Sequence, residues 1–151
     1  GITYICTGGT KGGLLAVRTD GAGDVTDTHI VWRQARGIPR MPSLLLVDGM
    51  IFIVSDSGIG SCLDAATGNQ HWQERLGGEF AASPIYAGGR LYFFNQTGTS
   101  VALKPSRTYE PLATNKLDAG FMASPAVLGK ALILRTKTHL YRIEEGGKPQ
   151  R

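Results

Sequence analysis

A repeat of about 40 residues runs through the chain and constrains its fold more than any other feature. Three matching copies of one segment are Ser43–Ile53, Ser83–Phe93 and Ser124–Ile133. A second set of matching tetrapeptides lies downstream in each unit: Leu15–Arg18, Ser61–Asp64, Val101–Lys104 and Tyr141–Glu144. Because both sets keep one frame, we expect a single structural unit to repeat along the chain.

Each unit contains short runs of β-branched and aromatic residues separated by turn pairs, which is typical of strands joined by hairpins. Four such runs fit into about 40 residues, the usual length of a four-stranded β-propeller blade. In the third unit we expect strands at Ser83–Ala87, Leu91–Asn95, Ser100–Lys104 and Leu112–Leu117. No window keeps the apolar period of a helix over three turns. The predicted fold class is therefore all-β.

The units do not coincide with whole blades. The first begins with a second strand, Ile2–Thr7, and the last ends after a third strand near Glu145. We predict a β-propeller of four-stranded blades, here a partial ring of about 3.5 blades with three, four, four and three strands. The expected divisions are a partial blade at 1–40, blades at 41–80 and 81–121, a partial blade at 122–145 and a flexible tail at 146–151.

Composition excludes several other classes of protein. The 151 residues are 42% hydrophobic and 19% charged, which differs from a disordered chain, and the 21 glycines lack the period of collagen. The apolar runs, such as Leu44–Val47, are far too short for a transmembrane helix, so no transmembrane segment is expected. The formal net charge of +4 is spread along the chain, and we expect no nucleic-acid partner.

One motif in the second unit resembles a known repeat family. The segment Cys62–Trp72 is similar to the small-Leu-Asp-x-x-Thr-Gly-x-x-x-Trp signature of PQQ-like propeller repeats. Asp and Thr-Gly suit a tight turn between the third and fourth strands, and tryptophan is a large apolar anchor. In the family this is called tryptophan docking, which implies that Trp72 packs between blades. Trp32 holds the same position 40 residues earlier, whereas the third unit has Lys104–Ser106 in place of the turn and no following tryptophan.

The resemblance implies two alternative functions, since the family includes quinoprotein dehydrogenases and the lipoprotein scaffold of the outer-membrane β-barrel assembly machinery. One is a non-enzymatic scaffold for protein or ligand binding, in a bacterial periplasm or cell envelope. The other is part of a quinoprotein-like oxidoreductase, whose PQQ, calcium ion, vicinal cysteine pair and aspartate base lie in other blades. Because Cys6 and Cys62 are not vicinal, we favour the scaffold and expect no cofactor in this chain, with PQQ only under the alternative.

Three carboxylates, Asp20, Asp24 and Asp27, lie in one glycine-containing segment and are candidate ligands for a calcium ion. Their spacing differs from that of an EF-hand, and aspartate and glycine are the ordinary residues of solvated turns. We therefore favour an extended turn over a metal site.

The arginines Arg33, Arg36 and Arg40 form the most prominent basic cluster and lie where one blade joins the next. An anionic ligand or an acidic partner loop could bind there. The cluster lacks the interleaved aromatic side chains of a single-stranded nucleic-acid site. We favour a solvated loop.

No catalytic arrangement is predicted. Ser43, Ser83 and Ser124 recur at one place in the unit, which favours a structural role because a catalytic nucleophile is needed only once. They lack a Gly-x-Ser-x-Gly elbow. The histidines show no metal-ligand spacing: His29, His71 and His139.

An open ring would expose two blade flanks. We therefore expect the chain to be the C-terminal half of a larger propeller, to self-associate in isolation, and to have as its partner either a protein or the missing half.

Overall fold

The structure is a computed structural model that describes residues 1–7 and 13–144. These residues form fourteen strands and no helix, which confirms the predicted all-β class. They accordingly contain no helix that could span a membrane. The flexible tail predicted at 146–151 lies outside the described residues.

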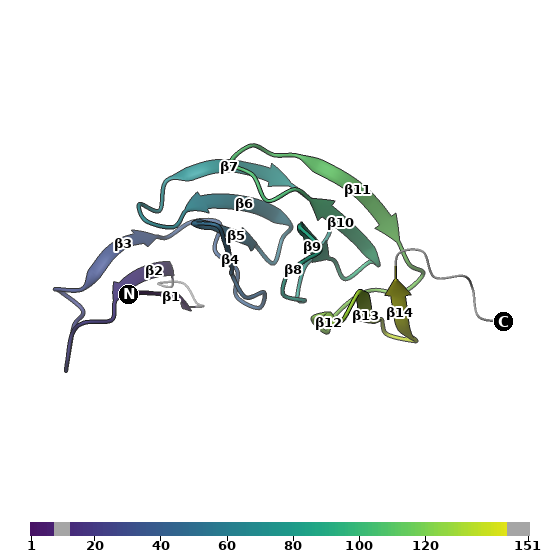
Figure 1. The fold of residues 1–151 in the computed structure, drawn as a ribbon, viewed down its shortest axis with the longest axis horizontal. Coiled ribbons are helices and arrows are strands. Elements are labelled where there is room, and N and C mark those ends of the chain that lie inside the picture. Colours follow the sequence, from purple (N-terminus) through teal and green to yellow (C-terminus); the bar gives the residue numbers. More distant parts are fainter. Residues whose placement is uncertain (8–12, 145–151) are drawn as a thin grey trace.

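The strands form four antiparallel sheets in chain order (Figure 1). The first sheet contains β1 (Ile2–Thr7), β2 (Gly13–Arg18) and β3 (Ile30–Gln34). The second contains β4 (Leu45–Val47), β5 (Met50–Val54), β6 (Ile59–Asp64) and β7 (Gln70–Arg75). The third contains β8 (Ile85–Ala87), β9 (Arg90–Phe94), β10 (Thr99–Leu103) and β11 (Pro111–Lys116). The fourth contains β12 (Ala126–Leu128), β13 (Ala131–Arg135) and β14 (Leu140–Glu144).

The four sheets follow one another around an open arc (Figure 1). The outer strands β7 and β11 lie on its convex side, and the short inner strands β4, β8 and β12 lie on its concave side. Neighbouring inner strands β4 and β8 contact each other. This radial arrangement is that of propeller blades, so the predicted partial ring is confirmed.

The strand registers place corresponding residues of the repeat in corresponding places. One row of paired residues crosses each sheet: Tyr4, Ala16 and Trp32; Leu45, Phe52, Cys62 and Trp72; Ile85, Tyr92, Ala102 and Ala113; and Ala126, Ile133 and Arg142. The row of the first sheet therefore begins at the strand that corresponds to the second strand of a complete blade. The row of the fourth sheet ends at the strand that corresponds to the third.

An apolar layer fills each space between adjacent sheets. Successive residues of a strand point to opposite faces, so β5 sends Ile51 and Ile53 toward the first sheet and Phe52 and Val54 toward the third. Both faces of the second sheet are thus covered, which explains why β5 is an unbroken apolar run and is buried throughout. The layer between the third and fourth sheets contains Phe94, Phe121 and Leu134, among others.

Candidate functional site

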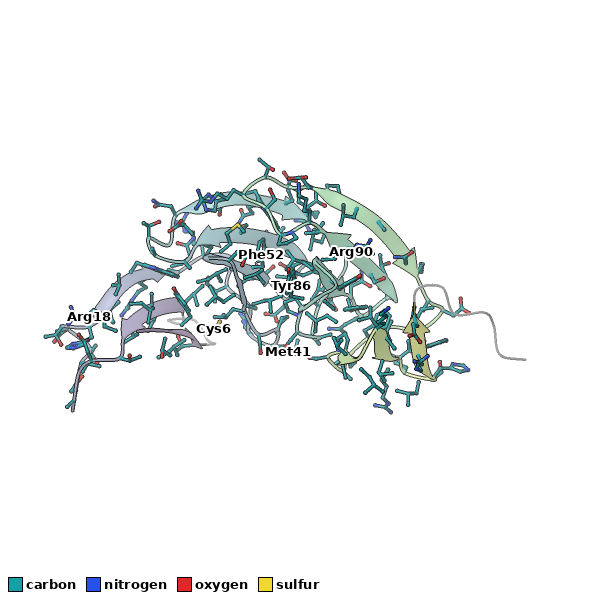
Figure 2. All side chains as sticks on the ribbon, viewed as in Figure 1. Cys6, Arg18, Met41, Phe52, Tyr86 and Arg90 are labelled. Carbon is teal, nitrogen blue, oxygen red and sulfur yellow. The ribbon has the colours of Figure 1, made fainter. Side chains whose placement is uncertain are left out.

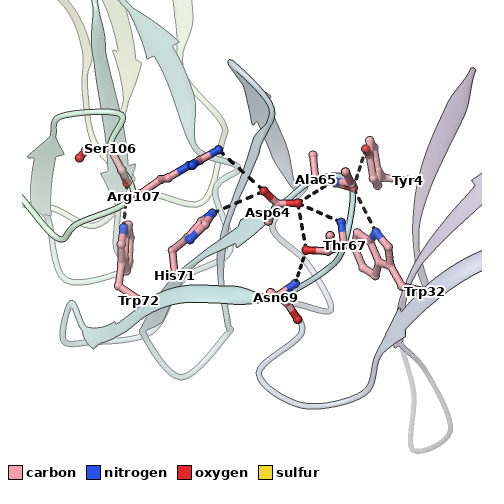
Figure 3. Close-up of polar contacts among 11 residues, drawn as sticks. Tyr4, Trp32, Asp64, Ala65, Thr67, Asn69, His71, Trp72, Ser106 and Arg107 are labelled. Atoms are coloured by element: carbon pink, nitrogen blue, oxygen red, sulfur yellow. Dashed lines mark hydrogen bonds and ion pairs between the residues drawn. The ribbon is translucent and has the colours of Figure 1, made fainter.

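The turn between β6 and β7 is organised by Asp64 (Figure 3). Its Oδ1 atom accepts the N–H groups of Ala66 at 3.1 Å and Thr67 at 2.9 Å, and the Thr67 hydroxyl at 3.0 Å. These hydrogen bonds, those from Thr67 above all, hold the pKa of the Asp64 carboxyl below its ordinary value. The turn closes at Gly68, whose φ of 73° lies in the left-handed region that favours glycine.

The first sheet docks onto this turn through two side chains. Trp32 Nε1 donates to the Ala65 carbonyl at 3.0 Å, and the Tyr4 hydroxyl donates to the same oxygen at 2.9 Å (Figure 3). A Cβ atom at Gly68 would lie 2.7 Å from the Trp32 ring, so this close approach requires glycine. The turn of the second sheet is therefore the receptor for the tryptophan of the first.

The next junction repeats this contact with different partners. Trp72 is almost fully buried, and its Nε1 donates to the Ser106 carbonyl at 3.1 Å. Its ring packs against Phe52 and, in a T-shaped arrangement, against Tyr109, with centroid separations of 6.1 and 5.4 Å. Phe52 stands where the first sheet has Tyr4, so this junction lacks the second hydrogen bond.

The third junction has no tryptophan at the corresponding position. The register places Ala113 where the earlier sheets have Trp32 and Trp72, and β11 is exposed along its whole length. Phe94 and Phe121 instead meet edge to face at 5.1 Å, and Phe121 N donates to the Asn95 carbonyl at 3.1 Å. The third unit, whose sequence contains no tryptophan, thus has a different aromatic pair at its junction with the fourth sheet.

Two basic side chains approach the other oxygen of Asp64. His71 Nε2 lies 3.8 Å and Arg107 Nη2 lies 3.9 Å from Asp64 Oδ2. His71 Nε2 is buried and has no hydrogen-bond partner among the described residues. Because Arg107 lies in the loop between β10 and β11 of the third sheet, this long ion pair spans a junction, and its exposure makes it a weak contribution to stability.

A ladder of hydrogen bonds joins the segments that lead into the inner strands. Ser43 N donates to Ser83 Oγ at 3.0 Å, and Ser83 N donates to Ser124 Oγ at 2.9 Å. The hydroxyls of Ser83 and Ser124 thus each hold the preceding repeat against the repeat that contains the hydroxyl. The structural role predicted for the recurring serines is confirmed for the hydroxyls of Ser83 and Ser124.

The inner strands expose apolar side chains at one repeated position. Leu46, Tyr86 and Val127 occupy the middle of β4, β8 and β12 and are between 43% and 50% exposed. We call these three residues the inner row. Met41 and Met122, which precede β4 and β12, are also exposed. Figure 2 labels Met41 and Tyr86. Apolar residues exposed at matching positions in three consecutive sheets mark an interaction surface better than scattered ones do.

The three candidate calcium ligands engage local groups. Asp20 Oδ1 pairs with Arg18 Nε at 3.0 Å, and Asp24 Oδ1 accepts Thr26 N–H at 3.0 Å. Both contacts lower the pKa of the carboxyl concerned. Asp27 lies in the same exposed segment. Across residues 1–7 and 13–144, no three His, Cys, Asp or Glu side chains are grouped so that they could hold a metal ion.

The candidate arginines lie at the first junction. Arg33 is in β3, while Arg36 and Arg40 are in the link to β4, and all three are exposed. The link is fixed by Asp56, whose carboxylate accepts the backbone N–H groups of Arg40 and Met41, each at 3.1 Å. Sequence analysis did not single out Asp56, because one aspartate in a hairpin turn carries no distinctive signal.

The two cysteines are separate. Cys62 is fully buried in β6, and burial raises the pKa of its thiol to about 11. Cys6 in β1 donates to the Pro39 carbonyl at 3.2 Å, and burial again raises the thiol pKa. Both are therefore protonated packing residues at neutral pH.

Comparison with known proteins gives a consistent result. A family model described as outer membrane protein assembly factor BamB matches residues 21–108, more than half of the chain. The crystal structure of BamB from Moraxella catarrhalis matches with a TM-score of 0.73 and 20% identity, over 95% of this chain and 42% of that chain. A europium-containing methanol dehydrogenase matches with a TM-score of 0.56 and 16% identity, over 76% of this chain and 23% of that chain. No curated protein matches the sequence.

At these identities the structural matches show a shared fold. The chain spans less than half the length of either solved structure.

Proposed function

Because the chain belongs to the family of the outer membrane protein assembly factor BamB, we propose that it is a non-enzymatic propeller scaffold that binds another protein. The proposal places it in the bacterial periplasm or cell envelope, as the family description implies. The observation that carries it is the inner row, which presents Leu46, Tyr86 and Val127 from three consecutive sheets. Exposed apolar side chains gain free energy when a partner removes them from water.

The blade junctions supply the rigidity that a scaffold needs. We propose that Trp32 and Trp72 are tryptophan-docking anchors of the kind that the PQQ-like repeat signature implies. Their indole groups bond to backbone carbonyls of the following sheet. With the blades fixed in this way, the inner row keeps one shape before a partner arrives, which lowers the entropy cost of binding.

Site-specific crosslinking tests the scaffold role. A photoreactive phenylalanine analogue is placed at Tyr86, in a chain expressed in the envelope of a bacterium, and irradiated. We expect discrete crosslinked protein products. The matched control carries the same analogue at Leu112, which is 51% exposed on the outer strand β11. Identical products at the two positions, or none at Tyr86, would contradict the inner row as a binding surface.

The alternative is an oxidoreductase that uses PQQ. The described residues do not fit that cofactor, since Cys6 and Cys62 lie in different sheets and both thiols have raised pKa values. The match to a methanol dehydrogenase concerns the fold alone. We propose that this chain binds no redox cofactor. Titration with PQQ, with and without calcium, should leave tryptophan fluorescence and the melting temperature unchanged, and saturable micromolar binding would favour the oxidoreductase.

A further inference from the structure

We propose that two copies of this chain pair through one face of the arc, which is acidic over the first two sheets and basic over the last two. The proposal goes beyond the scaffold function, because this face contains no residue of the inner row. Its physical basis is electrostatic complementarity. In a pair related by a two-fold axis, the acidic half of each copy lies against the basic half of the other.

The face is formed by the connections at one end of the sheets. Because neighbouring strands are antiparallel, the first and third connections of a four-stranded sheet leave it at the same end. Contacts between sheets align these ends: Trp32 of β3 reaches the β6–β7 turn, Trp72 of β7 reaches the β10–β11 loop, and the serine ladder aligns the third and fourth sheets. We call this end the turn face: residues 19–29, 48–49, 65–69, 88–90, 104–110 and 129–130.

The inner connections of the turn face change sign along the arc. The β4–β5 turn of the second sheet carries Asp48. In the third sheet, β9 begins with Arg90 directly after its turn, and the β12–β13 turn of the fourth sheet carries Lys130. All three side chains are exposed, and none of them forms an ion pair within residues 1–7 and 13–144.

The outer connections change sign in the same direction. The β2–β3 loop of the first sheet carries Asp24 and Asp27, and the third outer strand of the second sheet ends at Asp64. At the place that matches Asp64, 40 residues later, the third sheet has Lys104, and Arg107 follows in the same loop. The acidic and basic halves meet where Arg107 approaches Asp64 at 3.9 Å.

Local ion pairs cancel only part of this charge. Arg18 pairs with Asp20, and Lys104 pairs with Glu110, each at 3.0 Å. The exposed charges that remain are acidic in the first half and basic in the second: Asp24, Asp27 and Asp48, then Arg90, Arg107 and Lys130.

This order of charges identifies the partner. A partner of one sign is repelled by half of the turn face, whereas a second copy related by a two-fold axis presents the two signs in the opposite order. Any arrangement that places like halves together is opposed by repulsion. The charges therefore select both the second copy and its orientation.

Sedimentation equilibrium at two salt concentrations tests the proposal. The chain carries Leu140→Asp, because Leu140 is 72% exposed at the end of β14 that is remote from the turn face, and this change removes apolar association there. We expect a dimer at about 20 mM salt whose affinity falls about tenfold or more at about 300 mM, because salt screens charges. Association that does not respond to salt would overturn the proposal.

Reversing the charge of either half should abolish the pair. Arg90→Glu with Lys130→Glu makes the turn face mainly acidic, and Asp24→Lys with Asp27→Lys makes it mainly basic. Each double variant alone should be monomeric at about 20 mM salt, and an equal mixture of the two should associate.

A matched control separates the turn face from net charge. Arg36→Glu with Lys137→Glu causes the same change in net charge as the first variant, but both residues lie at the other end of the sheets. This variant should dimerise like the chain with an unaltered turn face.

Crosslinking of the unaltered turn face decides the matter even if a variant fails to fold. A carbodiimide joins a lysine amine directly to a carboxylate, and a mixture of ¹⁵N-labelled and unlabelled chains reveals which crosslinks join two copies. We expect such crosslinks between Lys130 and Asp24, Asp27 or Asp48. Lys137 should form none with these carboxylates.

The contrary outcomes are distinct. A dimer that survives Arg90→Glu with Lys130→Glu, or crosslinks between copies from Lys137 in place of Lys130, would overturn the proposal. A chain that stays monomeric at low salt but binds poly-glutamate would assign the basic half to an acidic partner and overturn it too. Crosslinking from Tyr86 without a dimer would leave the scaffold function standing and remove only this inference.

Discussion

At the residue scale, the tryptophan at each junction combines apolar burial with one backbone hydrogen bond. Trp72→Ala removes a nearly buried side chain that packs on Phe52 and Tyr109 and bonds to Ser106. We expect a loss of about 3 to 5 kcal/mol in the free energy of unfolding, measured by denaturant titration. Leu112→Ala is the control, since its exposed side chain should change stability by less than about 0.5 kcal/mol. An unchanged midpoint for Trp72→Ala would refute the anchor.

Residue-scale contacts also show where sequence patterns reach their limit. The two tryptophans follow from a motif and its spacing, but the atom that receives Trp32 is the carbonyl of Ala65, and a backbone oxygen leaves no mark on the sequence. Tyr4 donates to the same oxygen. The next repeat has a phenylalanine at this position, and the repeat pattern does not distinguish the tyrosine that makes a contact from the phenylalanine that does not.

At the element scale, the turn between β6 and β7 depends on a charged carboxylate. Hydrogen bonds from Thr67 lower the pKa of Asp64, so the folded state favours the ionised form. Its contribution to stability is therefore fully present above the ordinary pKa of 3.8 and is lost as the pH falls through the lower folded value. Thermal melts should show the wild-type advantage over Asp64→Asn shrinking between about pH 5 and pH 2. Asp118→Asn, in the link before β12, is the control, and a pH-independent advantage would contradict this account.

Strand positions were predictable because alternation and turn pairs are local signals. In the third unit the observed strands depart from the expected ranges by a residue or two, and the largest shift has a physical cause. Strand β8 begins at Ile85 rather than Ser83, because Ser83 N bonds to Ser124 Oγ and Pro84 has no N–H group to pair. Such contacts between repeats are invisible to a local pattern.

At the scale of the whole molecule, the outermost sheets turn apolar side chains away from their neighbours. Ile5 lies on the face of β1 opposite Tyr4 and Cys6, which pack toward the second sheet. Leu140, which is 72% exposed, lies on the face of β14 opposite Tyr141. We expect the isolated chain to associate at about 10 to 100 micromolar, because uncovered apolar faces of this kind favour contact.

Sedimentation equilibrium measures this association. Leu140→Asp should shift the chain toward monomer, whereas Leu112→Asp on β11 should not. A wild-type chain that stays monomeric at high micromolar concentration would contradict the expectation.

The missing tryptophan at the third junction has a consequence for how the molecule opens. A row of units that contact only their neighbours unfolds at the boundary with the smallest interface free energy. The first boundary has two hydrogen bonds to one carbonyl, the second has one with a buried indole, and the third has Ala113 in that place. Amide protons of β13 should therefore exchange faster than those of β5 and β9, as a cooperative unit. Local unfolding of this protein would then begin at β12–β14. The sheets whose junctions contain Trp32 and Trp72 would unfold only when the whole molecule unfolds.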